Sequence, residues 1–152
     1  MPKVLVVTGS PNDFVVMDHA VETLASFGVS SQKLSASAHR QPAKLHAALD
    51  TFVADGGQVV IAAAGMAAHI AGVVASQVTL PVLAVPLPGG IADGLDALLS
   101  MVQMPRGVPV ATFAVGKHGA INAALFAVQV LALSDPELVR ALVEHKRRLA
   151  ED

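Results

Sequence analysis

The sequence predicts a three-layer α/β/α fold in which a parallel sheet is covered by helices on both faces. Short apolar runs alternate with helix-like segments along the chain, which is the pattern of repeated β-α units. The run KVLVVT near the start is continuously apolar, as is typical of a strand that is buried on both faces. Five such units predict a five-stranded sheet, for which we expect the strand order 2-1-3-4-5.

The first half of the chain contains three predicted strands and two predicted helices. The second strand is more polar than the others, so we place it near an edge of the sheet. Gly28 ends the first helix, and Gly56-Gly57 forms the turn after the second. In chain order, the elements are the strand Lys3–Thr8, the helix Asp13–Phe27, the strand Val29–Ala36, the helix Pro42–Ala54 and the strand Gln58–Ala63.

The second half repeats this pattern and ends in two helices. The helix over His118–Leu133 is apolar nearly all round, so it must be buried on more than one side, and we expect a neighbouring subunit to supply part of that burial. In chain order, the elements are the helix Met66–Val78, the strand Pro81–Val85, the loop Pro86–Gly90, the helix Asp93–Val102, the strand Val108–Val115, and the helices His118–Leu133 and Pro136–Ala150.

The predicted strand order is that of flavodoxin-like folds, which bind ligands at the carboxyl edge of the sheet, beside the first strand. The chain contains no internal repeat, low-complexity tract or linker. We therefore expect a single domain over residues 1–152, with the C-terminal helix, about 136–150, packed on a neighbouring subunit.

The composition predicts an oligomer. Hydrophobic residues make up 53% and charged residues only 14% of the chain, against about 25% charged residues in ordinary globular domains. A membrane protein would explain these values, but Gly, Pro or polar residues interrupt each apolar run before the roughly 18 residues that a span needs. We therefore expect an extensive homo-oligomer. Met1-Pro2-Lys3-Val4 leads straight into a strand without a signal-peptide layout. We expect a cytoplasmic protein, which the absence of Cys fits.

Several functional classes are disfavoured by what the sequence lacks. The net charge is −2, and Trp and Tyr are absent, which argues against a nucleic-acid groove with stacking aromatics. The chain has no Cys, which excludes disulfides, thiolate catalysis and Cys-ligated metals. His, Asp and Glu show no metal-ligand spacing, and neither GxxxxGK[ST] nor GxGxxG occurs. We expect no cofactor, no metal and no membrane partner.

The most informative segment is Ser37-Ala38-His39-Arg40, at the turn from the second strand into a helix. Turns of this kind lie at the carboxyl edge of an α/β sheet. The guanidinium of Arg40 suits a phosphate, and the imidazole of His39 can move protons near neutral pH. The alternative is a solvated surface loop, but the expected position beside the first strand favours a functional site.

Two more loops reach the same predicted edge. Gly9-Ser10-Pro11-Asn12-Asp13 follows the first strand and can bind an anion, or can serve only as a helix cap through Asn12 or Asp13. Ala64-Gly65-Met66-Ala67-Ala68-His69 follows the third strand, and its small residues let a ligand approach the backbone. His69 is either a site residue or, as we favour from the sequence, a structural hydrogen-bonding residue.

Together with two segments further along the chain, these loops match the patterns of one enzyme family. G-S-x-S-D-W corresponds to Gly9–Phe14, S-A-H-R-T-P to Ser37–Pro42, G-A-G-G-A-A-H-L-P-G to Ala62–Gly72 with changes, L-L-S-I-V-Q-M-P-x-G-V-P-V to Leu98–Val110, and K-A-G-A-x-N-A-A-L to Lys117–Leu125. The chain thus resembles, up to about Leu133, the bacterial PurE family. These enzymes are the N5-carboxyaminoimidazole ribonucleotide (N5-CAIR) mutases of purine biosynthesis.

The resemblance implies a flavodoxin-like homo-octamer that moves a carboxyl group from N5 to C4 of an aminoimidazole ribonucleotide, without ATP or a cofactor. It implies that His39 is the general acid and base, that Ser10 and Arg40 hold the 5′-phosphate, and that Asp13 binds the ribose hydroxyls. The full set of substrate-binding residues that we expect is Gly9, Ser10, Asp13, Ser37, Arg40, Ala64, Gly65, Met66, Ala67 and His69.

The chain departs from the family pattern at a few site positions. The family's second Ser is replaced by Asn12 and its Trp by Phe14. A Gly of the third loop is replaced by Met66, and the Pro after the His is replaced by Ala71. The SAHR segment and the alanine-rich third loop resemble the mutase branch more than the animal-type carboxylase branch, which uses free CO2. Two alternatives stay open at this point: a related carboxylase or decarboxylase acting on another ribonucleotide, and a non-catalytic module that binds nucleotide phosphates.

Overall fold

A five-stranded parallel sheet forms the middle layer of the computed structural model, which describes residues 1–151. The strand order is β2-β1-β3-β4-β5, as predicted, and every neighbouring pair is parallel. The strands are β1 (Val4–Thr8), β2 (Ser31–Ser35), β3 (Val59–Ala64), β4 (Val82–Pro86) and β5 (Ala111–Thr112). The polar second strand lies at an edge, where one of its sides needs no strand partner.

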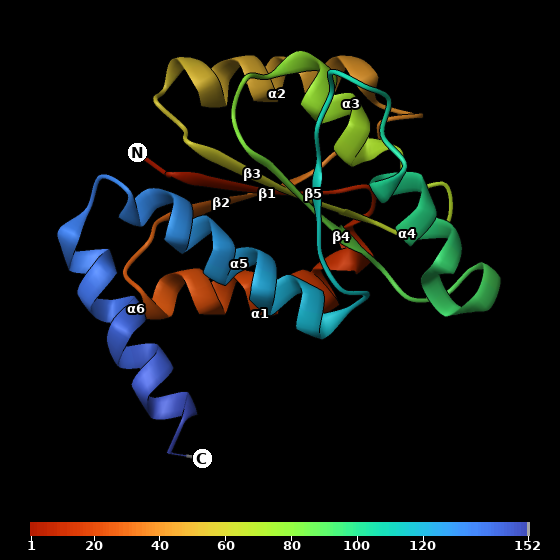
Figure 1. Cartoon of the computed structure of the whole chain (residues 1–152). Coiled ribbons are helices and arrows are strands. Elements are labelled where there is room, and N and C mark those ends of the chain that lie inside the picture. The colour runs from red at the N-terminus through yellow and green to blue at the C-terminus, as the bar shows by residue number, and fades with distance from the viewer. Residues whose placement is uncertain (152) are drawn as a thin grey trace.

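Helices cover both faces of this sheet (Figure 1). Three of them, α2, α3 and α4, pack on one face, and α1 and α5 pack on the other, with α6 against α5. The helices are α1 (Phe14–Ser26), α2 (Pro42–Ala54), α3 (Ile70–Gln77), α4 (Leu95–Val102), α5 (Lys117–Ala132) and α6 (Pro136–Leu149), with short 3-10 turns η1 (Pro11–Asp13) and η2 (Ile91–Gly94).

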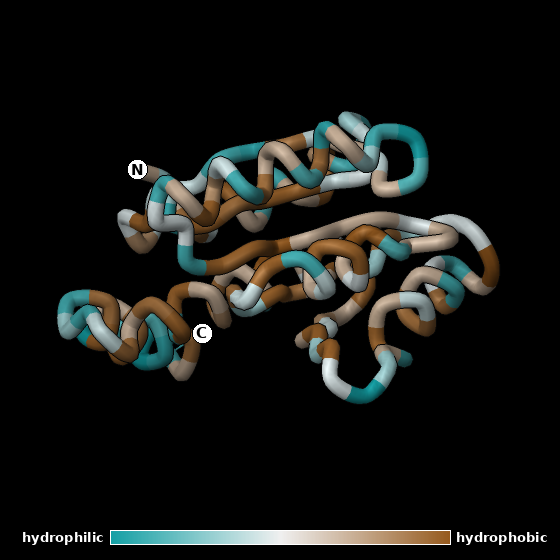
Figure 2. Tube along the Cα trace, turned by 90° about the horizontal axis from the view of Figure 1, so that it is seen from above, coloured by the Kyte–Doolittle hydropathy of each residue, from teal (hydrophilic) through white to brown (hydrophobic). Residues whose placement is uncertain are grey.

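The continuous apolar runs build two separate cores. Successive side chains of a strand point to opposite faces, so Val4 and Val6 of β1 enter the core beneath α1 and α5. Leu5 and Val7 enter the core beneath α2, α3 and α4. All four are at most 1% exposed, which explains why the sequence shows no alternation of polar and apolar residues here. Figure 2 shows hydrophobic residues along the central strands and hydrophilic stretches toward the outside.

Most elements begin and end within a few residues of the predicted bounds, but two are much shorter than the sequence predicts. The strand expected over Val108–Val115 is regular only at Ala111–Thr112, because Pro109 has no N–H for the ladder and the strand lies at an edge. The helix expected from Met66 begins only at Ile70. Met66 has a backbone φ of +53°, in the left-handed region, and a right-handed helix cannot continue through it.

The apolar helix α5 is covered mainly by its own chain. It packs against α1, α6 and the sheet, so a second subunit is not required for most of the burial that its sequence predicts. Leu133, just beyond its end, is 89% exposed. Helix α6 buries only Leu138, and its contact with a neighbouring subunit stays a prediction. Among the residues that the structure describes, none of the helices combines the length and apolar composition that a membrane span requires.

Candidate active site

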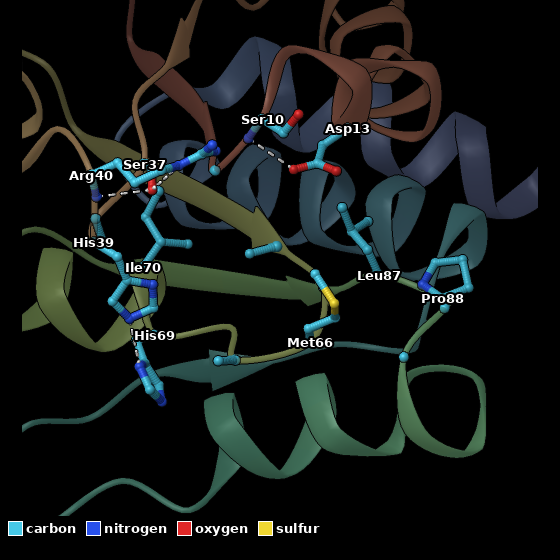
Figure 3. Close-up of a pocket in the computed structure, with 17 residues that line it drawn as sticks. Ser10, Asp13, Ser37, His39, Arg40, Met66, His69, Ile70, Leu87 and Pro88 are labelled. Carbon is cyan, nitrogen blue, oxygen red and sulfur yellow. Dashed lines mark hydrogen bonds between the residues drawn. The ribbon is translucent and has the colours of Figure 1, made fainter.

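Loops from four strands line an open cavity of about 750 Å³ at the carboxyl edge of the sheet (Figure 3). The strand register explains why three of these loops meet: Thr8, at the end of β1, pairs with Ser35 on one side and with Ala63 on the other. All the residues that the sequence predicts for the site line this cavity: Gly9, Ser10, Asp13, Ser37, His39, Arg40, Ala64, Gly65, Met66, Ala67 and His69.

The first loop is both a helix cap and a wall of the cavity. The Ser10 hydroxyl accepts a hydrogen bond from Asn12 N (3.3 Å), and the Asp13 carboxylate accepts one from Ser10 N (3.0 Å). This reciprocal pair is a capping box. Ser10 therefore caps η1. Of the two caps that the sequence offered, Asp13 is the N-cap residue of α1, although its side chain makes no capping hydrogen bond to that helix, and Asn12 caps neither element. Asn12 is exposed and does not line the cavity.

Burial raises the pKa of the Asp13 carboxyl above its ordinary value, and the hydrogen bond from Ser10 N lowers it by a smaller amount. Desolvation disfavours the charged form, whereas a donor directed at the carboxylate favours it. Asp13 therefore presents a partly desolvated acceptor to the cavity.

The loop after β2 directs the guanidinium of Arg40 toward the loop after β1. Ser37 is buried, and its hydroxyl accepts hydrogen bonds from Arg40 N (3.2 Å) and from Arg40 Nε (3.5 Å). In Figure 3 the Arg40 side chain runs past Ser37 toward Ser10. Within residues 1–151, no carboxylate forms a salt bridge with Arg40. The guanidinium can therefore bind a phosphate, and the Ser10 hydroxyl, which accepts in the capping box, has a hydrogen that it can donate to the same anion.

A pair of histidines occupies another side of the cavity. Nε2 of His39 lies 2.9 Å from Nδ1 of His69, and the two rings meet edge to face. His39 comes from the loop after β2, and His69 directly precedes α3. His69 is thus both a hydrogen-bonding residue and a cavity residue, two roles that the sequence presented as alternatives. One ring must supply the proton of this bond, which suits the pair to proton transfer.

The third loop holds a strained methionine. Two hydrogen bonds close the turn, from Ala68 N to Met66 O and from His69 N to Ala67 O, both 2.9 Å. A left-handed backbone costs a residue with a Cβ about 1–2 kcal/mol, and the Met66 side chain is 66% exposed, so core packing does not offset this cost. Ala64, Gly65 and Ala67 leave the rest of this wall open to a ligand.

A fourth loop, after β4, was not predicted as part of the site. It contributes Leu87, Pro88, Gly89 and Gly90, and Ile70 of α3 also lines the cavity. The loop has no polar side chain that would single it out, but its position after a buried strand next to β3 could have indicated it. The Asp93 carboxylate accepts a hydrogen bond from Gly89 N at 2.9 Å and thereby holds the loop. Gln103, Lys117 and His118 are polar residues of the two later segments that match the family pattern, and they do not line this cavity.

The cavity offers three chemical environments: a cationic end at Arg40, a hydrogen-bonded pair of imidazoles at His39 and His69, and an apolar wall around Met66 and Leu87. Within residues 1–151, no group of three or more His, Cys, Asp or Glu side chains is placed to hold a metal ion.

Comparison with known proteins decides the family. The model of a family described as AIR carboxylase, where AIR is aminoimidazole ribonucleotide, matches residues 3–152. The chain belongs to the AIR carboxylase family. An N5-carboxyaminoimidazole ribonucleotide mutase of Saccharolobus solfataricus is 45% identical over 152 residues, which cover 100% of this chain and 95% of that protein. The enzyme of the same name from Escherichia coli K12 is 42% identical over 150 residues, which cover 99% of this chain and 89% of that protein.

The solved structures agree with this assignment. The crystal structure of Treponema denticola PurE superposes with a TM-score of 0.91 at 26% identity, covering 99% of this chain and 93% of that one. The flavodoxin-like strand order and the resemblance to PurE that the sequence predicts are therefore confirmed.

The raised pKa of Asp13 predicts how an Asp13→Asn variant behaves. Because the folded chain holds this proton more tightly than the unfolded chain, the stability from this group is complete below the ordinary carboxyl pKa of about 3.9. That stability is lost as the pH rises through the raised pKa. Asn removes the charge and keeps an acceptor for Ser10 N. We expect the variant to exceed the unsubstituted protein in free energy of unfolding near neutral pH, and to approach it in acid.

Urea unfolding across this pH range measures the difference, with Asp55→Asn, an exposed site, as the control for net charge. A variant that is less stable by the same amount at every pH would contradict the assignment of burial as the main cause.

Proposed function

We propose that this protein converts N5-CAIR to 4-carboxyaminoimidazole ribonucleotide (CAIR) in purine biosynthesis, the activity that its relatives' names describe. The observation that carries the proposal is the placement of Arg40 and His39, adjacent in sequence, in the lining of one cavity. One neutral-pH proton carrier and one phosphate-binding cation are what an aminoimidazole ribonucleotide requires of its site. Family membership at more than 40% identity supports the same activity.

The residues at the Arg40 end of the cavity would hold the substrate by its 5′-phosphate. Arg40 and the Ser10 hydroxyl would bind the 5′-phosphate through charge-assisted hydrogen bonds, and Asp13 would accept hydrogen bonds from the ribose hydroxyls. Ser37 holds Arg40 in place through its hydroxyl, 3.2 Å from the Arg40 backbone nitrogen. Binding at this end places the imidazole between the histidine pair and the wall around Met66, since those are the remaining sides of the cavity.

The histidine end performs the chemistry. N5-CAIR is a carbamate, so a proton from His39 to N5 lets the N5–carbon bond break and releases CO2. The nucleophilic C4 of the imidazole then attacks CO2, and His39, now neutral, removes the C4 proton. One proton is given and one is taken back, so a single general acid and base suffices. His39 has two ring nitrogens and can keep its 2.9 Å contact with His69 at one while serving substrate at the other.

His39→Asn tests this role. Asn keeps a polar side chain but cannot exchange a proton, so we expect the rate of CAIR formation to fall by at least about a hundredfold. CAIR formed from N5-CAIR without ATP is the quantity to measure. The matched control is His46→Asn, an exposed histidine on α2 that does not line the cavity. Normal turnover by His39→Asn would exclude His39 as the proton carrier.

Arg40→Met tests the phosphate site. A hydrogen bond to a charged group contributes about 1.5–3 kcal/mol, and each 1.4 kcal/mol is about tenfold in affinity. We therefore expect KM to rise by about 10–100-fold, and the residual binding to depend less on salt concentration. Arg106→Met, at an exposed turn outside the cavity, is the control. An unchanged KM in Arg40→Met would place the phosphate elsewhere.

We infer that the protein acts in the cytoplasm as a homo-oligomer, and the family resemblance indicates an octamer that needs no cofactor. An apolar stripe on α4 supports assembly: Leu95, Leu99 and Val102 are 46%, 49% and 49% exposed. Their spacing puts them on one face of the helix. Val139 and Val143 form a second exposed apolar pair on α6. The small share of charged residues, 14%, agrees with surfaces that other subunits cover.

Leu99→Glu tests this assembly. A charge in the middle of the α4 stripe should be costly to bury, so we expect the mass in solution, measured by light scattering, to fall below that of the unsubstituted protein. Gln58→Glu adds the same charge at an exposed position between α2 and β3 and should leave the mass unchanged. An unsubstituted protein that is monomeric at micromolar concentration would contradict the inference.

A further inference from the structure

We propose that the Met66 side chain is a flexible cover over the reacting carboxyl group, which retains CO2 between its release from N5 and its capture by C4. The proposal rests on the mutase function proposed above and assigns a positioning role to a residue at which the chain differs from the family pattern.

The position of Met66 is the first argument. It follows the buried strand β3, and its loop lies against the loop after β4, since a Cβ on Gly65 would meet Leu87 O and Pro88 O at 3.7 Å. Figure 3 shows the Met66 sulfur in the opening between Leu87 and the two histidines. The side chain therefore lies across the cavity from the group that transfers the proton.

The backbone of Met66 is the second argument. Its φ of +53° is a conformation that glycine adopts without strain, and the family pattern has glycine here. The side chain is 66% exposed and takes no part in either core, so the fold gains little from it. A strained residue that the fold does not need indicates a local function.

The chemistry of the intermediate is the third argument. Once the N5–carbon bond has broken and N5 holds the proton from His39, the site contains AIR and CO2. CO2 is small and uncharged, so Arg40 and the other polar groups hold it weakly. Escape into water ends the turnover with AIR as product, whereas bond formation to C4 completes it. An apolar cover slows escape and keeps water out.

A thioether suits this task. Methionine is unbranched and polarizable, so its side chain can swing aside for substrate entry and then fill an irregular gap. The neighbouring wall is apolar or small, formed by Ala64, Ala67 and Leu87. With substrate bound, Met66 can close this wall over the carboxyl group, and the surrounding alanines leave room for that movement.

The experiment measures which fraction of the CO2 released in the site escapes, leaving AIR, and which fraction is captured by C4 to give CAIR. The unsubstituted protein is given N5-CAIR, and the ratio of AIR to CAIR formed is measured and corrected for decarboxylation without enzyme. Met66→Ala keeps a Cβ at this backbone position and removes the thioether, Met66→Gly removes both, and Met66→Leu restores an apolar side chain. Ile91→Ala is the control, an exposed apolar residue of η2 outside the cavity lining.

We expect Met66→Ala and Met66→Gly to raise the ratio of AIR to CAIR by about tenfold, the effect of losing a small apolar contact. Met66→Leu should restore most of the retention, and Ile91→Ala should match the unsubstituted protein. Met66→Gly should also melt at a higher temperature than Met66→Ala, because alanine is strained at this φ.

Three results would overturn the proposal. The ratio of AIR to CAIR could be unchanged in both Met66→Ala and Met66→Gly, or Met66→Leu could release as much AIR as Met66→Ala. The number of subunits could also change in Met66→Ala, which would make Met66 an interface residue. A different failure concerns the proposed function itself. If the unsubstituted protein forms no CAIR, both the proposed mutase function and the role of Met66 are wrong. If it forms CAIR but the Met66 variants leave the ratio of AIR to CAIR unchanged, only the role of Met66 is wrong.

Discussion

The parallel pairing of β1 with strands on both of its sides is the constraint on which the site depends. Thr8 is level with Ser35 of β2 and with Ala63 of β3, so three loops leave the sheet at one height. Residues far apart in the chain therefore face one cavity, and His39 and His69 come within 2.9 Å of each other. The two cores above and below the sheet hold this register, because a slip by one residue would move each buried side chain of β1 from the core that it fills to the opposite one.

Two groups at the site are held in unfavourable states by this rigid frame. The pKa of Asp13 is raised because its carboxyl is partly desolvated, and Met66 has a left-handed backbone without the benefit of burial. Elsewhere the local preferences mostly agree with the fold: buried strands are apolar, and glycines occupy most of the positive-φ positions, with Ala92 and Asp93 of η2 as exceptions outside the cavity lining. At the cavity, binding can offset a conflict between local preference and fold.

The sequence predicts the sheet order and the polar loops because both follow from local patterns: apolar runs, turn residues and the rule that parallel strands share a carboxyl edge. The start of α3 could not be predicted in this way, because it depends on the φ of Met66, a residue that ordinarily continues a helix. The contact between His39 and His69 depends in turn on that shortened helix. The loop from Leu87 to Gly90 was missed because it acts through backbone and apolar groups, which carry no distinctive pattern.

The polar side chains that line the cavity all lie between Ser10 and His69, whereas the exposed apolar stripes on α4 and α6 come later in the chain. The polar groups proposed to bind and convert the substrate are thus separated along the chain from the surfaces proposed to join subunits. Substitutions on those apolar surfaces leave every polar side chain of the cavity in place. Under the assembly proposed above, the number of copies that associate can therefore change while the polar lining of the cavity stays the same.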